Sequence, residues 1–199
     1  YDTIDWLIKN LPGNNGNVGV FGISYPGFYS TMAALSKHPA LKAVSPQAPV
    51  TDWFMGDDFH HNGALMLMDA FEFYKGFGVP RPLPVTQYSK GFERKNKDAF
   101  QFYLNTGPLP MFNQLYLGDS ISFWNDLMQQ GVYNDWWQAR NVRKYVSDIK
   151  PAMLVVGGTF DAEDVFGAWN LYKAIETSND AAHYNKLVMG PWFHGAWGG

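Results

Sequence analysis

A serine flanked by glycines is the first feature of the sequence whose residue types could do chemistry. Ser24 follows a short apolar run and precedes a helical pattern, within Gly22-Ile-Ser-Tyr-Pro-Gly27. This arrangement is typical of a nucleophile elbow, a sharp strand-to-helix turn that exposes a serine hydroxyl at the edge of a sheet. A Cβ at Gly22 or Gly27 is expected to collide with neighbouring backbone in such a turn. The second glycine comes one residue later than in the general G-x-S-x-G pattern, so the motif alone also fits an ordinary turn.

An acid and a histidine that could serve this serine occur later in the chain. Asp161 follows the apolar run 152–156, and His194 follows the run 186–189. In a serine hydrolase the histidine takes the serine proton, while the acid orients the imidazole and balances its charge. Alone, Asp161 fits a helix cap and His194 fits a loop histidine. Their order, serine then aspartate then histidine, is that of α/β-hydrolases, and together the three favour a catalytic triad.

The elements around these residues predict how they are brought together. Helical spacing over residues 1–10 leads through a loop into an apolar run that ends at Ser24, and a second short strand is expected at 41–44. After residue 147 the pattern of strand, helix and strand returns. Because the carboxyl ends of parallel strands share one edge of a sheet, Ser24, Asp161 and His194 should lie at the same edge. The predicted class is α/β, with a parallel sheet flanked by helices.

The middle of the chain has a different character. Prolines and glycines recur there, and aromatic helical segments are expected at 65–74, 98–104 and 120–128, whereas strand alternation is scarce. This predicts a helical cap inserted into the sheet domain. The division is residues 1–50 for the nucleophile part of the core, 51–147 for the cap, and 148–199 for the acid and histidine part. An α/β-hydrolase sheet normally has several strands before its nucleophile, so the chain is expected to be a partial α/β-hydrolase domain.

Composition narrows the class of protein. The chain has 199 residues, of which 46% are hydrophobic and 17% aromatic, and its net charge is -3. The weak negative charge and the lack of basic clusters argue against nucleic acid as a partner. No apolar run approaches the roughly 20 residues that span a bilayer. The absence of cysteine excludes disulfides and thiol catalysis and leaves the cellular compartment undecided.

Three segments resemble the signature sequences of the X-Pro dipeptidyl-peptidase and cocaine esterase group of serine hydrolases. They are Gly22-Ile-Ser-Tyr-Pro-Gly27, Gly158-Thr-Phe-Asp-Ala-Glu-Asp164 and Gly190-Pro-Trp-Phe-His-Gly195. The late glycine, a departure from the general elbow, is this group's own pattern. Within the group the sequence most resembles the α-amino-acid ester hydrolases and proteins named glutaryl-cephalosporin acylases, and this similarity includes Met55-Gly-Asp-Asp58. The resemblance is specific at these motifs and vague over residues 74–131.

The resemblance implies further features of the site. The Tyr25 N–H would contribute to the oxyanion hole, while the group's second donor, a tyrosine hydroxyl on an upstream strand, is not in this chain. A jelly-roll domain would follow the histidine, and export to the periplasm or medium would be expected. Enzymes of the α-amino-acid branch bind the substrate ammonium with carboxylates, and Asp135 resembles one of those acids. Its neighbour Asn134 stands where a second acid is expected, so amino-acid specificity stays open.

Other candidate binding residues each have two interpretations. Asp57 and Asp58 are an acidic pair that fits either a substrate site or a solvated loop. Trp53 and Trp136 fit either an acyl pocket or the hydrophobic core. We expect no catalytic metal and no cofactor. His60 and His61 are adjacent, whereas two histidines that bind one metal ion from a helix are four residues apart.

The sequence thus predicts a serine hydrolase that cleaves acyl esters or amides through an acyl-enzyme. Its substrate would be a small molecule or short peptide, including α-amino-acid esters or β-lactam side chains. The alternatives are an X-Pro dipeptidyl-peptidase and, from another class, a non-catalytic binding module on the same fold. Acyl preference and oligomeric state stay open, with a homo-oligomer among the alternatives.

Overall fold

Four parallel strands form the centre of the protein in the computed structural model, which describes residues 1–87 and 92–198. Their spatial order is β1 (Val18–Ile23), β2 (Leu41–Gln47), β5 (Ala152–Gly158) and β6 (Asn185–Gly190). The neighbours β2 and β5 are joined by more than a hundred residues of intervening chain. The strand pairs on both sides of this junction are consecutive in sequence, so the sheet is assembled from two distant segments.

Three helices accompany the sheet. α2 (Tyr25–Leu35) packs on β1 and β2, and α8 (Val165–Ser178) packs on β5 and β6. α1 (Asp2–Asn10) joins the same core through Ile4. The core beneath these helices consists of aliphatic and other small apolar side chains. Its fully buried members include Val44, Val155, Ala168, Leu171 and Ile175.

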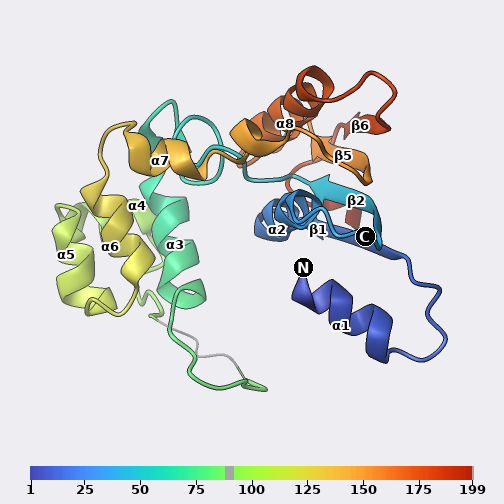
Figure 1. Cartoon of the computed structure of the whole chain (residues 1–199). Coiled ribbons are helices and arrows are strands. Elements are labelled where there is room, and N and C mark those ends of the chain that lie inside the picture. Colours follow the sequence, from blue (N-terminus) through green and yellow to red (C-terminus); the bar gives the residue numbers. More distant parts are fainter. Residues whose placement is uncertain (88–91, 199) are drawn as a thin grey trace.

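The segment between β2 and β5 forms a second group of elements. It contains a short hairpin, several helices and single helical turns. Outside this segment, a 3-10 turn, η3 (Ala196–Gly198), follows β6. The bounds in the inserted segment are β3 (His60–His61), β4 (Ala64–Leu65), α3 (Leu67–Phe77), α4 (Ala99–Thr106), α5 (Pro110–Phe112), the π-helical turn η1 (Asn113–Leu117), α6 (Ser122–Gln129), α7 (Asp135–Arg140) and the 3-10 turn η2 (Val142–Tyr145). Figure 1 shows α3, α4, α5 and α6 gathered on one side of the molecule, away from the sheet.

This inserted segment has its own core, built largely from aromatic rings. Phe71 lies at its centre, with ring centroids 4.9 Å from Phe112 and 5.9 Å from Trp124. All three side chains are fully buried. Many of the aromatic residues therefore fill the core of the cap. A short helix contributes few side chains, so large ones are needed to bury enough apolar area.

The structure confirms the predicted fold class, a parallel sheet flanked by helices with a helical insertion. The exact boundaries at residues 50 and 147 stay a prediction. Pattern reasoning did not find the β3–β4 hairpin, the helical turns over 110–117 or α7. Each of these elements is two to six residues long, which is too short for a hydrophobic period to be recognised. In the part of the chain that the structure describes, no helix has both the length and the apolar character needed to cross a membrane.

Candidate active site

The backbone at Ser24 has the strained geometry of a nucleophile elbow. Ser24 lies between β1 and α2 with φ 69° and ψ -129°, a region that residues with a side chain rarely adopt. Its N–H donates to the Gln47 carbonyl at 2.9 Å, and its carbonyl accepts the Phe28 N–H at 3.1 Å. These two bonds fix the residue between strand and helix, and Pro26 occupies the first turn of α2.

The two glycines of the motif are required by close backbone packing. A Cβ on Gly22 would collide with the backbone and ring of Pro26, in the first turn of α2. A Cβ on Gly27 would collide with the Gln47 carbonyl of the neighbouring strand and crowd Pro49. The collision expected from the sequence is confirmed at both positions. The later second glycine therefore belongs to this turn, because α2 crosses the end of β2 at that residue.

Asp161 and His194 form a hydrogen-bonded pair at the ends of the last two strands. The distance from His194 Nδ1 to Asp161 Oδ2 is 2.9 Å, and the carboxylate is almost wholly buried. The other oxygen, Oδ1, accepts the N–H groups of Glu163 at 2.9 Å and Asp164 at 3.0 Å. The acid is thus held from both sides, and its position fixes the orientation of the imidazole.

Electrostatics favour the charged forms of this pair. Burial is the largest influence on Asp161 and disfavours its ionisation, but the bond to His194 and the two backbone N–H groups outweigh it and lower its pKa. Burial likewise disfavours the charged imidazole, yet the bond to Asp161 and the charges of Asp161 and Glu163 raise the pKa of His194 above its usual value. An imidazole in this setting is a stronger base than a free histidine.

Ser24 opens into a cavity of about 460 Å³ between the sheet edge and the cap. Within the described residues, no hydrogen bond joins the Ser24 hydroxyl to His194. His194 Nε2 instead lies 3.8 Å from Glu163 Oε2, and Glu163 lines the cavity together with Ser24. Catalytic hydrogen bonds are often long in the absence of substrate. The cavity walls combine aromatic rings with carboxylates. They include Tyr25, Phe28, Trp53, Phe59, Phe73, Tyr74, Phe77, Asp58, Asp69, Glu72 and Glu163.

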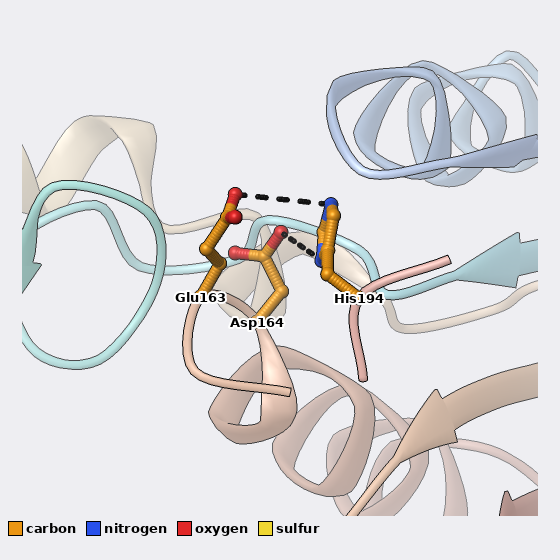
Figure 2. A group of neighbouring side chains, drawn as sticks. All are labelled: Glu163, Asp164 and His194. Carbon is orange, nitrogen blue, oxygen red and sulfur yellow. Dashed lines mark ion pairs between the residues drawn. The ribbon is translucent and has the colours of Figure 1, made fainter. Parts of the chain in front are cut away.

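Besides Asp161, three carboxylates lie near His194, those of Asp58, Glu163 and Asp164. Asp164 is fully buried, and its Oδ1 accepts the Asp58 N–H at 3.1 Å. Asp164 Oδ2 has no hydrogen-bond partner among the described residues and lies 3.9 Å from His194 Nδ1. Figure 2 shows Glu163 and Asp164 both directed towards the imidazole. Within the described residues, one atom from each of these two acids and one from His194 lie within 4.8 Å of one another.

The negative charges in this group are poorly compensated. Burial, followed by the charges of Asp57 and Glu163, raises the pKa of Asp58 to about 7. Burial and the charges of Asp58 and Asp57 raise the pKa of Asp164 well above its usual range. Carboxylates this close and this buried repel one another unless a proton or a cation lies among them. These acids can therefore either retain a proton or pair with a positively charged group in the cavity beside Ser24, which Asp58 and Glu163 line.

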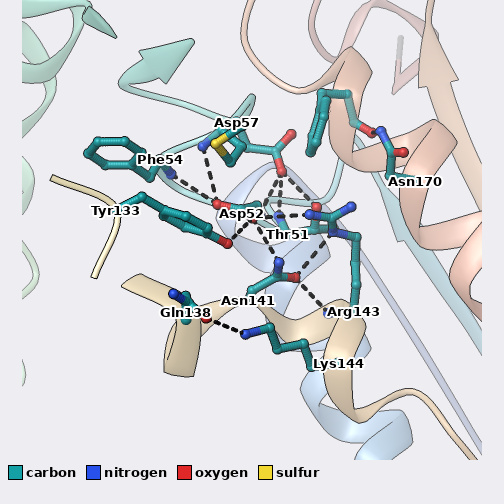
Figure 3. Close-up of polar contacts among 12 residues, drawn as sticks. Thr51, Asp52, Phe54, Asp57, Tyr133, Gln138, Asn141, Arg143, Lys144 and Asn170 are labelled. Carbon is teal, nitrogen blue, oxygen red and sulfur yellow. Dashed lines mark hydrogen bonds and ion pairs between the residues drawn. The ribbon is translucent and has the colours of Figure 1, made fainter. Parts of the chain in front are cut away.

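The neighbouring Asp57 has a different surrounding. Its Oδ2 accepts the Thr51 N–H at 2.7 Å, the Thr51 hydroxyl at 2.8 Å and the Asp52 N–H at 2.8 Å. The residue is fully buried and does not line the cavity. Figure 3 shows it folded into the loop that leads from β2 to the cap. Of the predicted acidic pair, the structure brings Asp58 to the Ser24 cavity and uses Asp57 to hold the loop.

The remaining predicted binding residues divide in the same way. Trp53 lines the Ser24 cavity and packs edge-on against Phe28. Asp135 is exposed in the first turn of α7, outside the cavity lining, and Asn134 caps that helix by accepting the N–H groups of Trp136 and Trp137. Trp136 stacks under the Arg140 guanidinium, 3.5 Å from the ring centre, and does not line the cavity.

Sequence reasoning missed Glu163 and Asp164 as site residues. Both stand within three residues of Asp161, in the acidic start of the helical segment, which is the signal that could have identified them. Asp58 reaches them because its N–H also donates to the Glu163 carbonyl at 3.2 Å. This backbone contact joins the entrance of the cap to the loop after β5.

The parallel sheet, the elbow at its edge and the helices on it define an α/β-hydrolase fold. The chain belongs to the X-Pro dipeptidyl-peptidase (S15) family, a family of serine hydrolases, whose model matches residues 1–196. It is 26% identical to the cocaine esterase of Rhodococcus sp. (strain MB1 Bresler), over 97% of this chain and 33% of that protein. It is 27% identical to the Xaa-Pro dipeptidyl-peptidase of Ligilactobacillus salivarius (strain UCC118), over 94% of this chain and 22% of that protein.

Two solved structures are similar over almost the whole chain. An aminopeptidase from the marine sediment archaeon Thaumarchaeota archaeon matches with a TM-score of 0.87 and 34% identity, covering 98% of this chain and 31% of that one. An α-amino acid ester hydrolase matches with a TM-score of 0.86 and 34% identity, with the same coverage. The chain thus spans a third or less of the length of each of these four proteins. The resemblance to this group that the motifs predicted is confirmed.

Proposed function

We propose that this chain carries the catalytic residues of a serine hydrolase that cleaves acyl esters or amides. The observation that supports this most directly is the Asp161–His194 hydrogen bond at the sheet edge to which the Ser24 elbow also belongs. Ser24 Oγ attacks the acyl carbon while His194 Nε2 takes its proton, and Asp161 stabilises the imidazolium that forms. His194 then protonates the leaving group, and a water activated by the same imidazole hydrolyses the acyl-enzyme.

The elbow also supplies one donor for the oxyanion. Tyr25 is the first residue of α2, and the first N–H groups of a helix have no partner within it. The partial positive charge at the helix start favours negative charge developing on the carbonyl oxygen. The Tyr25 N–H is the donor next to the nucleophile, and its ring lines the same cavity.

The acyl part of the substrate carries an ammonium group in this proposal. Asp58 and Glu163 face the Ser24 cavity, and the buried Asp164 lies behind them. An α-ammonium would lie close to the ester carbonyl, so these carboxylates can neutralise it while the aromatic wall receives the side chain. α-Amino-acid esters, and amides such as the side chains of β-lactams, have this form.

The second candidate is a dipeptidyl-peptidase, which would use the same carboxylates for the amino terminus of a peptide. Curated relatives of this chain carry that name. The two candidates differ in the bond that is cleaved, so the rates on an α-amino-acid methyl ester and on an X-Pro amide distinguish them. A non-catalytic module on the same fold would cleave neither.

Labelling with a fluorophosphonate tests the nucleophile in the full-length protein. We expect the wild type to be labelled and Ser24→Ala to be unlabelled, because only an activated serine reacts at a useful rate. Ser178→Ala, at an exposed serine of α8, is the matched control and should label like the wild type. Equal labelling of the Ser24→Ala variant, or no labelling of a folded wild type, would contradict the proposal.

Two further variants test the ammonium site. Asp58→Asn and Glu163→Gln each remove a charge from the cavity, and we expect KM for an α-amino-acid ester to rise at least about tenfold, or roughly 1.4 kcal/mol. The ester of the corresponding acid without its amino group should change far less. Asp135→Asn is the control, since Asp135 is exposed outside the cavity. An equal rise in KM for both esters would show that the carboxylates do not bind the ammonium group.

A further inference from the structure

The loop that carries His194 is bonded to the nucleophile elbow by a tryptophan three residues further on. Trp197, in η3, donates its indole N–H to Gln47 Oε1 at 2.8 Å. Gln47 is the last residue of β2, and its own carbonyl accepts the Ser24 N–H at 2.9 Å. One residue therefore bonds to both sides of the site, since its backbone holds the nucleophile and its side chain holds the histidine loop.

The acceptor in this bond is itself fixed. Gln47 Nε2 donates to the Ser45 hydroxyl oxygen at 3.2 Å, and that hydroxyl donates to the Leu154 carbonyl of β5 at 2.8 Å. An indole N–H can only donate, so it requires the oxygen of the Gln47 amide and leaves the amide nitrogen for Ser45. The bond from Trp197 is thus the first of three hydrogen bonds that run from η3 through β2 to β5.

The glycines on both sides of this tryptophan lie beside the residue that precedes the nucleophile. A Cβ on Gly195 would lie 3.6 Å from Ile23 Cγ2, and a Cβ on Gly198 would lie 3.2 Å from Ile23 Cδ1. The same loop is also bonded to the loop of the catalytic acid, because the Trp192 carbonyl accepts the Phe160 N–H at 3.0 Å. The backbone that carries the imidazole is therefore held between the elbow and the acid loop.

Asp161 alone does not determine where the imidazole meets the serine. Its bond to His194 Nδ1 fixes the orientation of the ring. The separation of Nε2 from the Ser24 hydroxyl is a further requirement, and within residues 1–87 and 92–198 no hydrogen bond joins these two groups. A displacement of about 1 Å in a reacting group can lower a rate by roughly a hundredfold. Contacts between the histidine loop and the elbow control this separation.

We propose that Trp197 is a positioning residue, which holds the histidine loop to Gln47 so that His194 Nε2 is aligned to take the Ser24 proton. Trp197 is not among the described residues that line the Ser24 cavity, so it acts on the reaction rather than on substrate binding. This role rests on the proposed function, because it requires Ser24 to be the nucleophile.

The rate and the final extent of fluorophosphonate labelling test this role in full-length Trp197→Phe, which lacks the indole N–H but keeps an aromatic ring. The extent counts folded molecules with an accessible serine, whereas the rate depends on the alignment of the base. We expect labelling at least about tenfold slower than in the wild type, with the same final extent. Gln47→Met removes the acceptor and should slow labelling similarly, and the double variant should be no slower than the slower single variant. Trp6→Phe, at a tryptophan of α1 that is 58% exposed, is the control and should label like the wild type.

Ester hydrolysis by the same variants separates positioning from stability. In Trp197→Phe, kcat should fall while KM and the pH dependence stay unchanged, because the Asp161–His194 bond that raises the imidazole pKa is kept. A smaller final extent of labelling with a normal rate would indicate a destabilised protein and overturn the positioning role. Labelling of Trp197→Phe at the wild-type rate would also overturn it and leave the proposed function intact. No labelling of a folded wild type would contradict the hydrolase itself and the positioning role with it.

Discussion

The sheet part and the cap of this protein are stabilised in different ways. Beneath α2 and α8 the core is made of small and aliphatic side chains, and backbone approaches backbone closely enough that glycine is required at Gly27. In the cap, aromatic rings fill the space between short helices, as Phe71 does among Phe112 and Trp124. One region depends on close backbone contacts, and the other on contacts between large side chains.

In the proposed hydrolase, this difference corresponds to a division between the reacting groups and the binding wall. Ser24, Asp161 and His194 all come from strand ends of the sheet part, where the backbone fixes their positions. The cap contributes wall residues of the cavity, among them Phe73 and Phe77 of α3. Groups that transfer protons need fixed geometry, whereas a binding wall can vary with the substrate. We therefore expect substitutions in the cap to change specificity more readily than the reaction itself.

A buried polar network ties the first residues of the cap to its last ones. Asp52 Oδ2 accepts the Tyr133 hydroxyl at 2.8 Å, Asn141 Nδ2 at 2.7 Å and Arg143 Nη2 at 3.0 Å. Oδ1 of the same carboxylate accepts the N–H groups of Phe54 and Met55. Figure 3 shows these groups converging on Asp52 from the loop after β2 and from the chain around α7. The entrance and the exit of the cap are thus tied at one residue.

The largest effect is expected from Gly27→Ala in the sheet part. The new Cβ would collide with the Gln47 carbonyl and crowd Pro49, and neither backbone group can turn away as a flexible side chain could. We expect a loss of more than about 4 kcal/mol in the free energy of unfolding, or no folded protein. Chemical denaturation followed by circular dichroism measures this. A loss below about 1 kcal/mol would show that α2 can shift away from β2.

A smaller but still large effect is expected from Asp52→Asn, where the first and last residues of the cap meet. The substitution keeps the shape but leaves the Arg143 guanidinium without its buried partner charge, and an amide nitrogen would face donors. We expect a loss of about 3 kcal/mol. Because Asp52 ties the cap rather than the sheet, protection from hydrogen exchange should fall in α6 and α7 before it falls in β1 and β2. Uniform loss across both parts would contradict the proposed linking role.

Sequence reasoning located the residues whose positions depend on local backbone geometry. The elbow around Ser24 requires glycines at fixed positions, and strand ends are marked by apolar runs, so the places of Asp161 and His194 could be inferred. The acids beside His194 were harder to find. Asp58 and Glu163 are more than a hundred residues apart, and only the chain crossing between the cap entrance and the loop after β5 brings them together.

The same limit of sequence reasoning explains why Asp135 was predicted as a binding residue but lies outside the cavity lining. Its local setting, an acid before two tryptophans, resembles a binding position, but in the structure this setting is the capped first turn of α7. Short cap helices carry little periodic signal, so the sequence does not show which of their faces meets the cavity. The aromatic residues of the cap form both a core and part of the cavity wall, with Phe71 in the core and Phe73 in the wall.

A modest effect is expected from Tyr133→Phe. The variant removes one of the three donors to Asp52 Oδ2 while keeping the ring, which stacks on Phe54 at 5.5 Å. Since Asn141 and Arg143 still pair with the carboxylate, we expect a loss of about 1 kcal/mol, the usual net worth of one hydrogen bond. A double-mutant cycle with Asp52→Asn should show coupling between the two sites. Additive losses would indicate that the hydroxyl contributes independently of Asp52.

The smallest effect, with the opposite sign, is expected from Gly76→Ala in α3. No atom lies within 4 Å of the Cβ that alanine would add, and the backbone is helical, so the change should stabilise the cap by about 0.5–1 kcal/mol. Gly107→Ala is the matched control, because its Cβ would also meet open space but its φ is +82°. That variant should lose stability, since alanine disfavours this conformation. Thermal denaturation of both variants separates available space from backbone conformation. If Gly76→Ala were as damaging as Gly27→Ala, the contrast between a loosely packed cap surface and a tightly packed sheet edge would not hold.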